Sequence, residues 1–224
     1  MASYIYMKIL ESQPDRYDRG IAWLSLGRLE QIKQGIVEEH VRPGMHILEI
    51  GAGTGTLAIL AAQKGAEVFG FDISPGMLEV ARRRVKAAGV EDKIELKEMG
   101  VAGMDRLADA SFDLVVSTLV FSEISPDEQA YALRQAFRVL KPGARIALAD
   151  ETRPKNLIKY LIYILIRTPL FLVTFALTQT STHAVRGLEG RVADCGFTLE
   201  KIERASLDTF IYLTATKGSK TWVQ

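Results

Sequence analysis

Apolar residues recur along this chain in two alternating patterns, which predict strands and helices in turn. Short continuous apolar runs, typical of buried strands, occupy Met45 to Ile50, Glu67 to Phe71, Lys93 to Lys97, Phe112 to Ser117 and Ala144 to Ala149. Helical spacing covers Ile21 to Val37, Thr56 to Lys64, Ser74 to Ala88, Ser125 to Val139 and Thr182 to Cys195. Strands that alternate with helices indicate a parallel sheet covered on both faces.

Capping and turn residues support these boundaries. Ser74-Pro75 combines a helix N-cap with proline at the first helical position. Ser125-Pro126-Asp127-Glu128 adds the glutamate of a capping box. Lys141-Pro142-Gly143 predicts a type II turn before the fifth strand.

The end of the chain predicts a hairpin. Phe197 to Glu203 and Thr209 to Thr216 are apolar runs joined by a few residues, so the two strands must be antiparallel. We therefore expect an α/β fold with a doubly wound, Rossmann-like sheet. Because the 224 residues contain no repeat or linker, we expect a single domain over 1–224, with N-terminal cap helices in 1–42 and an apolar helical insert in 152–180.

Composition removes several classes of function. The chain has 28 Lys and Arg against 27 Asp and Glu, and phosphate binding normally leaves a basic excess, so a nucleic-acid partner is not expected. Cys195 is the single cysteine, which excludes an internal disulfide and fits a reducing cytoplasm. His40, His46 and His183 are scattered, so we expect no metal site. The N-terminus lacks the pattern of a secretory signal, and we expect a cytoplasmic protein.

One segment, Leu157 to Thr178, is apolar nearly all round and is interrupted by Lys159, Arg167 and Pro169. An arginine at the middle of a spanning helix costs about 2.5–3.5 kcal/mol, and proline breaks a helix, so we expect two shorter helices that do not cross a membrane. An apolar surface of this length must be covered by something. Three interpretations stay open for 157–178: a lid over a hydrophobic substrate, peripheral membrane docking, or a homodimer interface.

Residues that could bind a ligand or take part in catalysis cluster where the first strand ends. Glu49 precedes Gly51-Ala52-Gly53-Thr54-Gly55, a turn that lets a ligand approach the main chain. Asp72 ends the second strand 17 residues beyond Gly55, where a carboxylate can accept hydrogen bonds from ribose hydroxyls. The dinucleotide fingerprint has a different glycine spacing, and a carboxylate would repel a pyrophosphate. The pattern therefore disfavours a nicotinamide cofactor and suits a cationic ligand with a free amino group, such as S-adenosylmethionine.

Four segments together resemble the class I S-adenosylmethionine-dependent methyltransferases: LEIGAGTG, GFDISPGML, FDLVVSTLVFSEI and RVLKPGARIAL. The resemblance extends from about Tyr17 to Thr216 and implies a seven-stranded sheet whose last strand is inserted antiparallel. It implies that the glycine turn approaches the cofactor, that Glu49 lies near its amino-acid end, and that Asp72 holds its ribose. The cofactor-binding residues that it implies are Glu49, Gly51, Ala52, Gly53, Gly55, Asp72, Ile73, Met77, Val101, Ala102 and Ser117.

The adenine end of this implied site departs from the family. Ile73 and Met77 match positions that flank the adenine, although either residue could equally be core. Many members carry an acidic residue after the third strand that takes the adenine amino group, whereas this chain has Gly100-Val101-Ala102. We therefore expect backbone groups near Val101 and Ala102 to recognise the adenine.

Within the family, Tyr17-Asp18 and the segment Ser117 to Ile124 most resemble the ubiquinone/menaquinone biosynthesis type, in which these segments line the methyl-transfer pocket. Relatives often have histidines where this chain has Phe121-Ser122-Glu123. If the acceptor must lose a proton, the candidate bases are Glu123 and Tyr17, and Glu123 could equally be a solvated loop carboxylate.

These expectations combine into methyl transfer from S-adenosylmethionine to a small, apolar acceptor, either quinone-like or lipid. The chain's opening, Tyr4 to Gly20, and Gln179-Thr180 show a weaker similarity to methyltransferases encoded beside corrinoid proteins, which would make a corrinoid protein the partner. A second alternative is a scaffold that binds S-adenosylmethionine without turnover.

Overall fold

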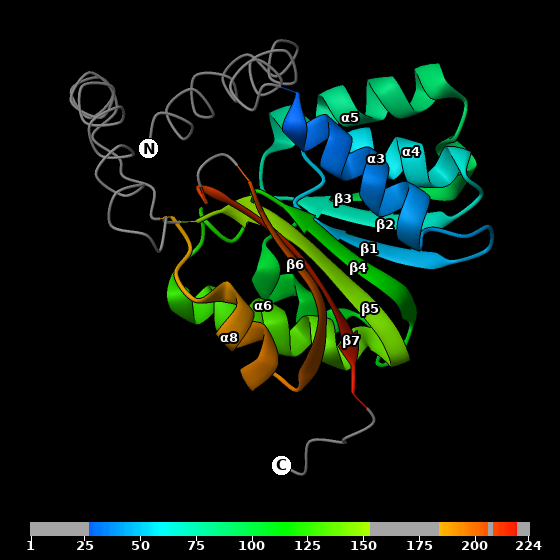
Figure 1. Cartoon of the computed structure of the whole chain (residues 1–224). Helices are drawn as coiled ribbons and strands as arrows, with labels where there is room; N and C mark the ends of the chain where they lie inside the picture. The colour runs from blue at the N-terminus through cyan, green and yellow to red at the C-terminus, as the bar shows by residue number, and fades with distance from the viewer. Residues whose placement is uncertain (1–26, 153–183, 206–207, 219–224) are drawn as a thin grey trace, which may run out of the picture.

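A seven-stranded sheet with helices on both faces forms the centre of the computed structural model, which describes residues 27–152, 184–205 and 208–218 (Figure 1). The strands are β1 (His46–Ile50), β2 (Glu67–Asp72), β3 (Ile94–Glu98), β4 (Phe112–Thr118), β5 (Leu140–Glu151), β6 (Phe197–Ala205) and β7 (Phe210–Lys217). Their order is β3-β2-β1-β4-β5-β7-β6. Strands β1 to β5 are parallel, and β7 is antiparallel to both β5 and β6. The predicted fold class and the inserted antiparallel strand are confirmed.

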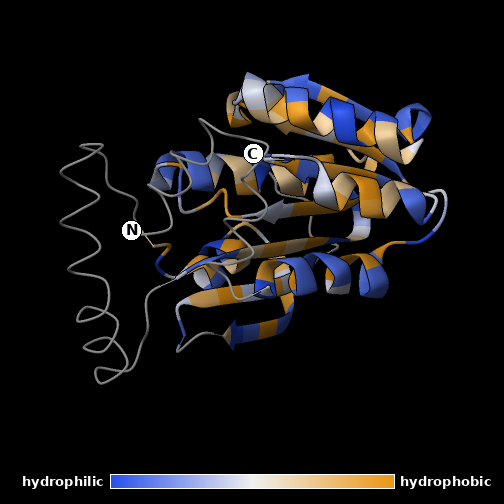
Figure 2. Ribbon diagram, turned by 90° about the horizontal axis from the view of Figure 1, so that it is seen from above, coloured by the Kyte–Doolittle hydropathy of each residue, from blue (hydrophilic) through white to orange (hydrophobic). Residues whose placement is uncertain are grey.

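Each face of the sheet carries its own layer of helices (Figure 1). Helices α3 (Arg28–His40), α4 (Thr56–Gln63) and α5 (Pro75–Ala88) cover one face, and α6 (Pro126–Val139) and α8 (Leu188–Asp194) cover the other. Side chains of β1 alternate between the two cores, because successive residues of a strand point to opposite faces. Ile47 joins the core under α3 and α4, whereas Leu48 and Ile50 join the core under α6 and α8. Figure 2 shows the hydrophobic strands between helices whose outer sides are polar.

Most predicted boundaries agree with the structure within a few residues. The Ser74 hydroxyl accepts the Met77 N–H at the start of α5, and Ser125 and Glu128 form the predicted capping box of α6. The leading helix ends at His40, and its predicted first part lies outside the described residues. Two short 3-10 helices, η1 (Glu91–Lys93) and η2 (Val101–Arg106), were not predicted.

Two predictions about local structure were wrong. The last helix, predicted over Thr182 to Cys195, is the shorter α8, because Gly187 adopts a left-handed conformation (φ 61°) at its N-cap. Strand β5 begins at Leu140, so Lys141-Pro142-Gly143 lies within it and does not precede it, although Gly143 has the positive φ (75°) that a type II turn requires. The register with β4 shifts from Phe112 opposite Leu140 to Leu114 opposite Arg145, so the Pro-Gly pair forms a bulge inside the sheet.

The chain leaves and re-enters the described structure at the carboxyl end of β5. Thr152 forms a parallel bridge with Val185, the Val185 N–H donates to the Glu151 carbonyl (2.9 Å), and the Thr152 hydroxyl donates to the Val185 carbonyl (3.0 Å). The predicted N-terminal cap helices, up to residue 26, and the predicted apolar insert, over 153–180, lie outside the described residues. Among the helices that the structure describes, none is long and apolar enough to cross a membrane.

Candidate functional site

A cavity of about 300 Å³ opens at the carboxyl ends of β1, β2 and β4. Ligands of open α/β sheets bind at this edge. The cavity brings together six of the residues predicted from sequence: Gly51, Gly53, Asp72, Ile73, Met77 and Glu123. Ser74 and the segment Thr118, Leu119 and Val120, which follows β4, complete the described lining.

The three glycines of the turn between β1 and α4 all adopt left-handed backbone conformations, with φ between 53° and 79°, which side chains other than glycine rarely tolerate. Their surroundings differ. A Cβ on Gly51 would clash with Val120, which lies directly against this glycine, and a Cβ on Gly55 would press against Ala81 of α5 at 3.1 Å. Gly53 has no neighbour within 4 Å of such a Cβ, so its main chain faces open space. Gly55 therefore packs helices, whereas Gly51 and Gly53 line the cavity.

Asp72 connects the glycine turn to the start of α5. Its carboxylate accepts the Gly53 N–H (2.8 Å) and the Ser74 N–H (2.9 Å), one on each oxygen. Burial raises the pKa of Asp72 above its usual range, and these N–H donors oppose the shift. Because each carboxylate oxygen has a second lone pair, Asp72 can accept ribose hydroxyls and keep both backbone bonds.

Glu49 is only 2% exposed and lies on the face of the sheet that α3 and α4 cover, outside the described cavity lining. The Ala58 N–H in the first turn of α4 donates to its carboxylate, a role that the N-cap Gly55 cannot fill without a side chain. Its Oε2 is buried and has no hydrogen-bond partner among the described residues. Burial raises the pKa of Glu49 to about 8, and Lys33 on α3 opposes this shift. An unused, buried carboxylate oxygen is the acceptor that a ligand ammonium group requires.

Ile73 and Met77 both line the cavity, but they differ in how exposed they are. Ile73 is 77% exposed, and its Cδ1 lies beside Gly100. Met77 is almost fully buried, although it contributes to the lining. An exposed isoleucine at the rim of a polar cavity offers an apolar surface to a flat base, so Ile73 suits the adenine position better than a core position.

Five other predicted residues lie outside the described lining: Ala52, Gly55, Val101, Ala102 and Ser117. Ser117 is buried, and its hydroxyl donates to the Ile50 carbonyl (3.1 Å), which ties β4 to β1. The Ala102 carbonyl accepts the Tyr131 hydroxyl (3.2 Å). Their contact with a cofactor stays a prediction, and Tyr17 lies outside the described residues.

Sequence reasoning missed Asp150, at the carboxyl end of β5. This carboxylate is 1% exposed and accepts the backbone N–H groups of Phe121 and Ser122 from the loop that follows β4. Burial raises the pKa of Asp150 to about 7, although hydrogen bonds from the Ser122 side chain and from the Glu151 and Phe121 N–H groups lower it. The available signal was an acidic residue at the end of an otherwise apolar run, Ile146 to Ala149.

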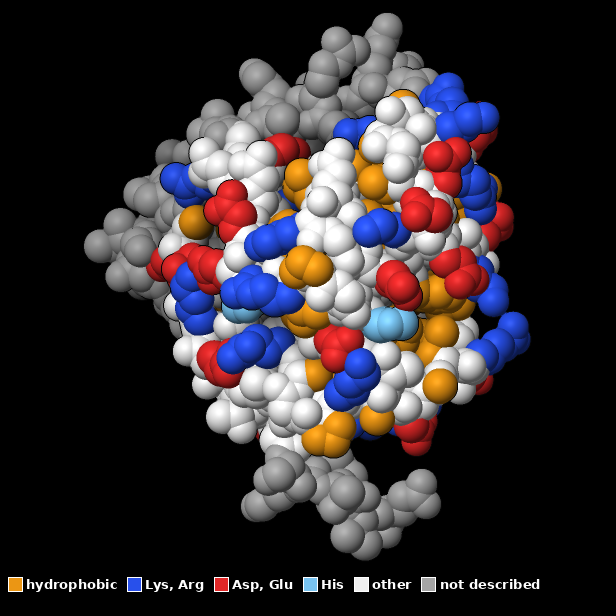
Figure 3. All heavy atoms as spheres, turned by 90° about the vertical axis from the view of Figure 1, so that its right-hand side faces the viewer, with side chains coloured by type: hydrophobic (Ala, Val, Ile, Leu, Met, Phe, Trp, Pro, Cys, Tyr) orange, Lys and Arg blue, Asp and Glu red, His pale blue; other side chains and the backbone are white. Residues whose placement is uncertain are grey.

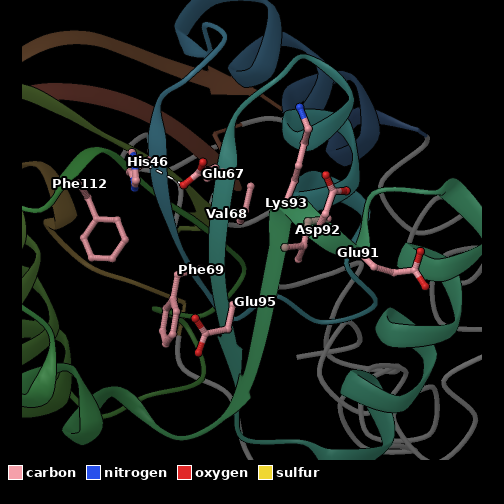
Figure 4. A pocket seen from close by; sticks show the side chains of 10 residues that line it. His46, Glu67, Val68, Phe69, Glu91, Asp92, Lys93, Glu95 and Phe112 are labelled. Atoms are coloured by element: carbon pink, nitrogen blue, oxygen red, sulfur yellow. Dashed lines mark ion pairs between the residues drawn. The ribbon is translucent and has the colours of Figure 1, made fainter.

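A second cavity, of about 320 Å³, lies at the opposite edge of the sheet, at the amino ends of β1 to β3 (Figure 4). His46 and Glu67 meet there at 3.5 Å. The surface of this edge mixes acidic and basic side chains without a dominant sign (Figure 3). Within the described ranges, no group of three or more His, Cys, Asp or Glu residues could hold a metal ion.

Comparison with known proteins decides the family. A methyltransferase domain family matches residues 47–143. A demethylmenaquinone methyltransferase from Symbiobacterium thermophilum is 31% identical over 182 residues, which cover 79% of this chain and 71% of the relative. This chain belongs to the class I S-adenosylmethionine-dependent methyltransferases of the ubiquinone/menaquinone type. S-Adenosylmethionine is therefore the cofactor of this methyltransferase.

Other relatives agree with this assignment. A demethylmenaquinone methyltransferase from Lactiplantibacillus plantarum is 35% identical over 142 residues, 62% of this chain, and the match spans only 59% of that relative. A solved S-adenosylmethionine-dependent methyltransferase from Methanosarcina mazei shares the fold, with a TM-score of 0.63, 22% identity, and coverage of 83% of this chain and 98% of that one.

The described residues fit the cofactor. Glu49 offers an unpartnered buried oxygen to an amino group, Asp72 keeps lone pairs for hydroxyls, and the main chain at Gly53 is open to close approach. Together they would hold the amino-acid and ribose parts, and Ile73 would contact the adenine.

Glu49→Gln should change how stability depends on pH. Because burial raises the pKa of Glu49 to about 8, the folded chain binds this proton more tightly than the unfolded chain does. The contribution of Glu49 to the free energy of unfolding therefore falls as the pH rises from about 4.5 to about 8, and is constant above that. Glutamine keeps an acceptor for Ala58 but does not titrate, so the variant should gain stability relative to the native chain across this window. Urea unfolding at several pH values measures the difference, and a difference independent of pH would contradict the assignment.

Gly53→Ala should weaken cofactor binding for a reason other than backbone strain. Gly89, the C-cap of α5, gives a matched control, since it also has a positive φ (67° against 53°) and nothing within 4 Å of an added Cβ. We expect Gly53→Ala and Gly89→Ala to lower stability similarly, by about 1 kcal/mol. Only Gly53→Ala should weaken S-adenosylmethionine binding in calorimetric titration, by roughly tenfold or more. Equal affinities in the two variants would show that the cofactor does not approach Gly53.

Proposed function

We propose that this methyltransferase transfers a methyl group from S-adenosylmethionine to a small, apolar, quinone-like acceptor. The relatives from Symbiobacterium thermophilum and Lactiplantibacillus plantarum carry the name demethylmenaquinone methyltransferase. The chain spans 71% and 59% of their lengths, so their acceptor supports the proposal by similarity.

The observation that carries the proposal is the contrast between the two walls of the cavity. One wall offers the Asp72 carboxylate and the main chain of Gly53. A second wall, which adjoins the glycine turn where Val120 lies directly against Gly51, offers the apolar side chains of Leu119 and Val120. A polar cofactor on the first wall would therefore meet an apolar acceptor at the second.

Positioning is the main task of the described residues in such a reaction. When bound, S-adenosylmethionine supplies a methyl group on a positively charged sulfur, which keeps the electron pair of the broken bond. Asp72 and the glycine turn would hold one reactant, and the segment after β4 would orient the other and exclude water. Holding two reactants in line can supply several kcal/mol, up to about 7–11 kcal/mol, of the barrier.

Glu123 is the residue we assign as proton acceptor if the acceptor reacts through a ring carbon, which must lose its hydrogen after methylation. Two carboxylates line the described cavity: Asp72 holds the glycine turn on the side where the cofactor would bind, and Glu123 lies in the segment after β4. Glu123 is exposed on the apolar side, beside Leu119 and Val120, and its own N–H donates to the Val120 carbonyl (2.9 Å). Tyr17, the other predicted base, remains a prediction.

Methylation of a reduced, short-chain demethylmenaquinone in detergent micelles tests the proposal. We expect S-adenosylhomocysteine and a methylated quinone by mass spectrometry. Glu123→Gln should lower kcat by roughly 10²–10⁴-fold with little change in cofactor affinity, as is usual for loss of a general base. Glu128→Gln is the matched control, because it changes an exposed carboxylate outside the cavity and keeps the capping box.

Other outcomes of this assay identify the alternatives. Methylation of a phospholipid in vesicles, without methylation of the quinone, would show that the acceptor is a lipid and not a quinone. Turnover only in the presence of a corrinoid protein would make that protein the partner. Cofactor binding without product from any of these acceptors would identify a scaffold and overturn the proposed reaction.

Ile73→Ser should weaken cofactor binding and leave stability nearly unchanged. Ile73 and Ile202 are the two exposed large hydrophobic residues of the described structure, and Ile202 lies on β6, outside the cavity lining. Removing an exposed isoleucine costs little folding energy, but removing an apolar contact with adenine should raise the dissociation constant by roughly three- to tenfold. Calorimetric titration of Ile73→Ser against Ile202→Ser checks this, and an effect of equal size in both variants would argue against an adenine contact.

A further inference from the structure

The loop that carries the apolar wall of the cavity, residues 119–124, begins with an unfavourable backbone conformation. Leu119 has a φ of 62°, in the left-handed region that residues other than glycine rarely occupy. Such a conformation persists where surrounding structure determines it, and it occurs often at functional sites. The Leu119 N–H donates to the Ala149 carbonyl on β5 (2.9 Å), so the loop is anchored to β5 from its first residue.

Asp150, the next residue on β5 after Ala149, provides the second anchor. One carboxylate oxygen accepts the Phe121 N–H at 2.7 Å, and the other accepts the Ser122 N–H at 3.2 Å. The second oxygen also accepts the Glu151 N–H at 2.7 Å, which fixes the carboxylate to its own strand. Both oxygens are therefore occupied by backbone donors, and the side chain is 1% exposed.

The carbonyl groups of the same loop are held from the other side by Gln129 on α6. Its side-chain amide donates to the carbonyls of Phe121 and Ile124. Arg191 on α8 donates to the Gln129 side-chain oxygen, which leaves the amide hydrogens directed at the loop. Gln129 is 4% exposed, so water does not compete well for these bonds. Two buried side chains thus hold the backbone of the loop, Asp150 at its N–H groups and Gln129 at its carbonyl groups.

We propose that Asp150 is a positioning residue for methyl transfer, because its bonds to the Phe121 and Ser122 amides set the position of Leu119, Val120 and Glu123 at the cavity. The proposal rests on the proposed function, which places the acceptor against this loop. Asp150 does not line the cavity itself, so it acts through the loop and does not touch the reacting atoms.

Asp150→Asn tests the proposal with little change in side-chain size. A carboxamide has one acceptor oxygen and one donor nitrogen, so it cannot accept N–H groups on both sides as the carboxylate does. We expect the amide hydrogens of Phe121 and Ser122 to exchange roughly tenfold faster or more, since their bonds open more often. With the quinone acceptor, kcat should fall by roughly ten- to a hundredfold through loss of alignment. The dissociation constant for S-adenosylmethionine should change by less than about threefold, because Asp72 and Gly53 lie on the other wall.

Asp113→Asn is the matched control. Asp113 is another carboxylate of the sheet that accepts a backbone N–H, that of His46 (2.9 Å), but it lies near the amino end of β4, away from the cavity. The Asp113→Asn variant should be less stable than the native chain, but its kcat and the rate of amide hydrogen exchange at Phe121 and Ser122 should not change. If Asp150→Asn does not fold, Gln129→Met loosens the same loop from its carbonyl side and should give the same separation of kcat from cofactor affinity.

The outcomes separate this inference from the proposed function. If the native chain methylates no acceptor, the proposed function fails, and amide exchange still decides whether Asp150 holds the loop. If the native chain is active, and Asp150→Asn exchanges faster but keeps the native kcat, the positioning role is overturned. Equal losses of kcat in Asp150→Asn and Asp113→Asn would also overturn it, because they would reflect general destabilisation.

Discussion

The turn between β1 and α4 must reverse the chain above a buried sheet, and its backbone N–H groups must find acceptors there. The Phe71 carbonyl accepts the N–H groups of Gly51 and Ala52, and Asp72 accepts that of Gly53. The acceptors for these three N–H groups come from the end of β2, whereas the Gly55 N–H donates to the Ala52 carbonyl within the turn. The conformation of the glycine turn therefore depends on the neighbouring strand, and the cofactor wall exists only when the two strands are in register. The placement of α4, its cap at Glu49 and the cavity itself follow from this constraint.

Features with a local cause could be predicted from the sequence. The strands appear as short apolar runs, the starts of α5 and α6 appear as Ser-Pro caps, and the glycine turn with Asp72 identifies the site. The Pro-Gly bulge in β5 was missed because Pro-Gly is typical of a turn, and only pairing with β4 keeps it in the sheet. The resemblance predicted that the segment Ser117 to Ile124 lines the pocket, but not which of its side chains do so, because Leu119 and Val120 could equally have been core residues. Asp150 was missed because its partners lie 28 and 29 residues earlier, and no local pattern records that approach.

Buried carboxylates recur at the carboxyl edge of the sheet. Glu49, Asp72 and Asp150 each accept hydrogen bonds from backbone N–H groups, and burial raises the pKa of each. Backbone donors stabilise all three carboxylates, and Lys33 adds a positive charge only near Glu49. The edge thus retains an acceptor-rich character, which complements the positively charged sulfur and amino group of the cofactor. The same arrangement explains why a pyrophosphate would be a poor ligand here.

The position of β7 between β5 and β6 has a consequence for how this chain is made. The ribosome completes β6 before β7, yet β6 reaches the sheet only through β7. During synthesis, β6 therefore waits without a sheet partner, and the outer edge of β5 keeps unpaired N–H and C=O groups. Unpaired strand edges are the surfaces through which separate chains join. The order of translation thus sets an interval in which the nascent methyltransferase is open to aggregation, and this interval ends when β7 is inserted between β5 and β6.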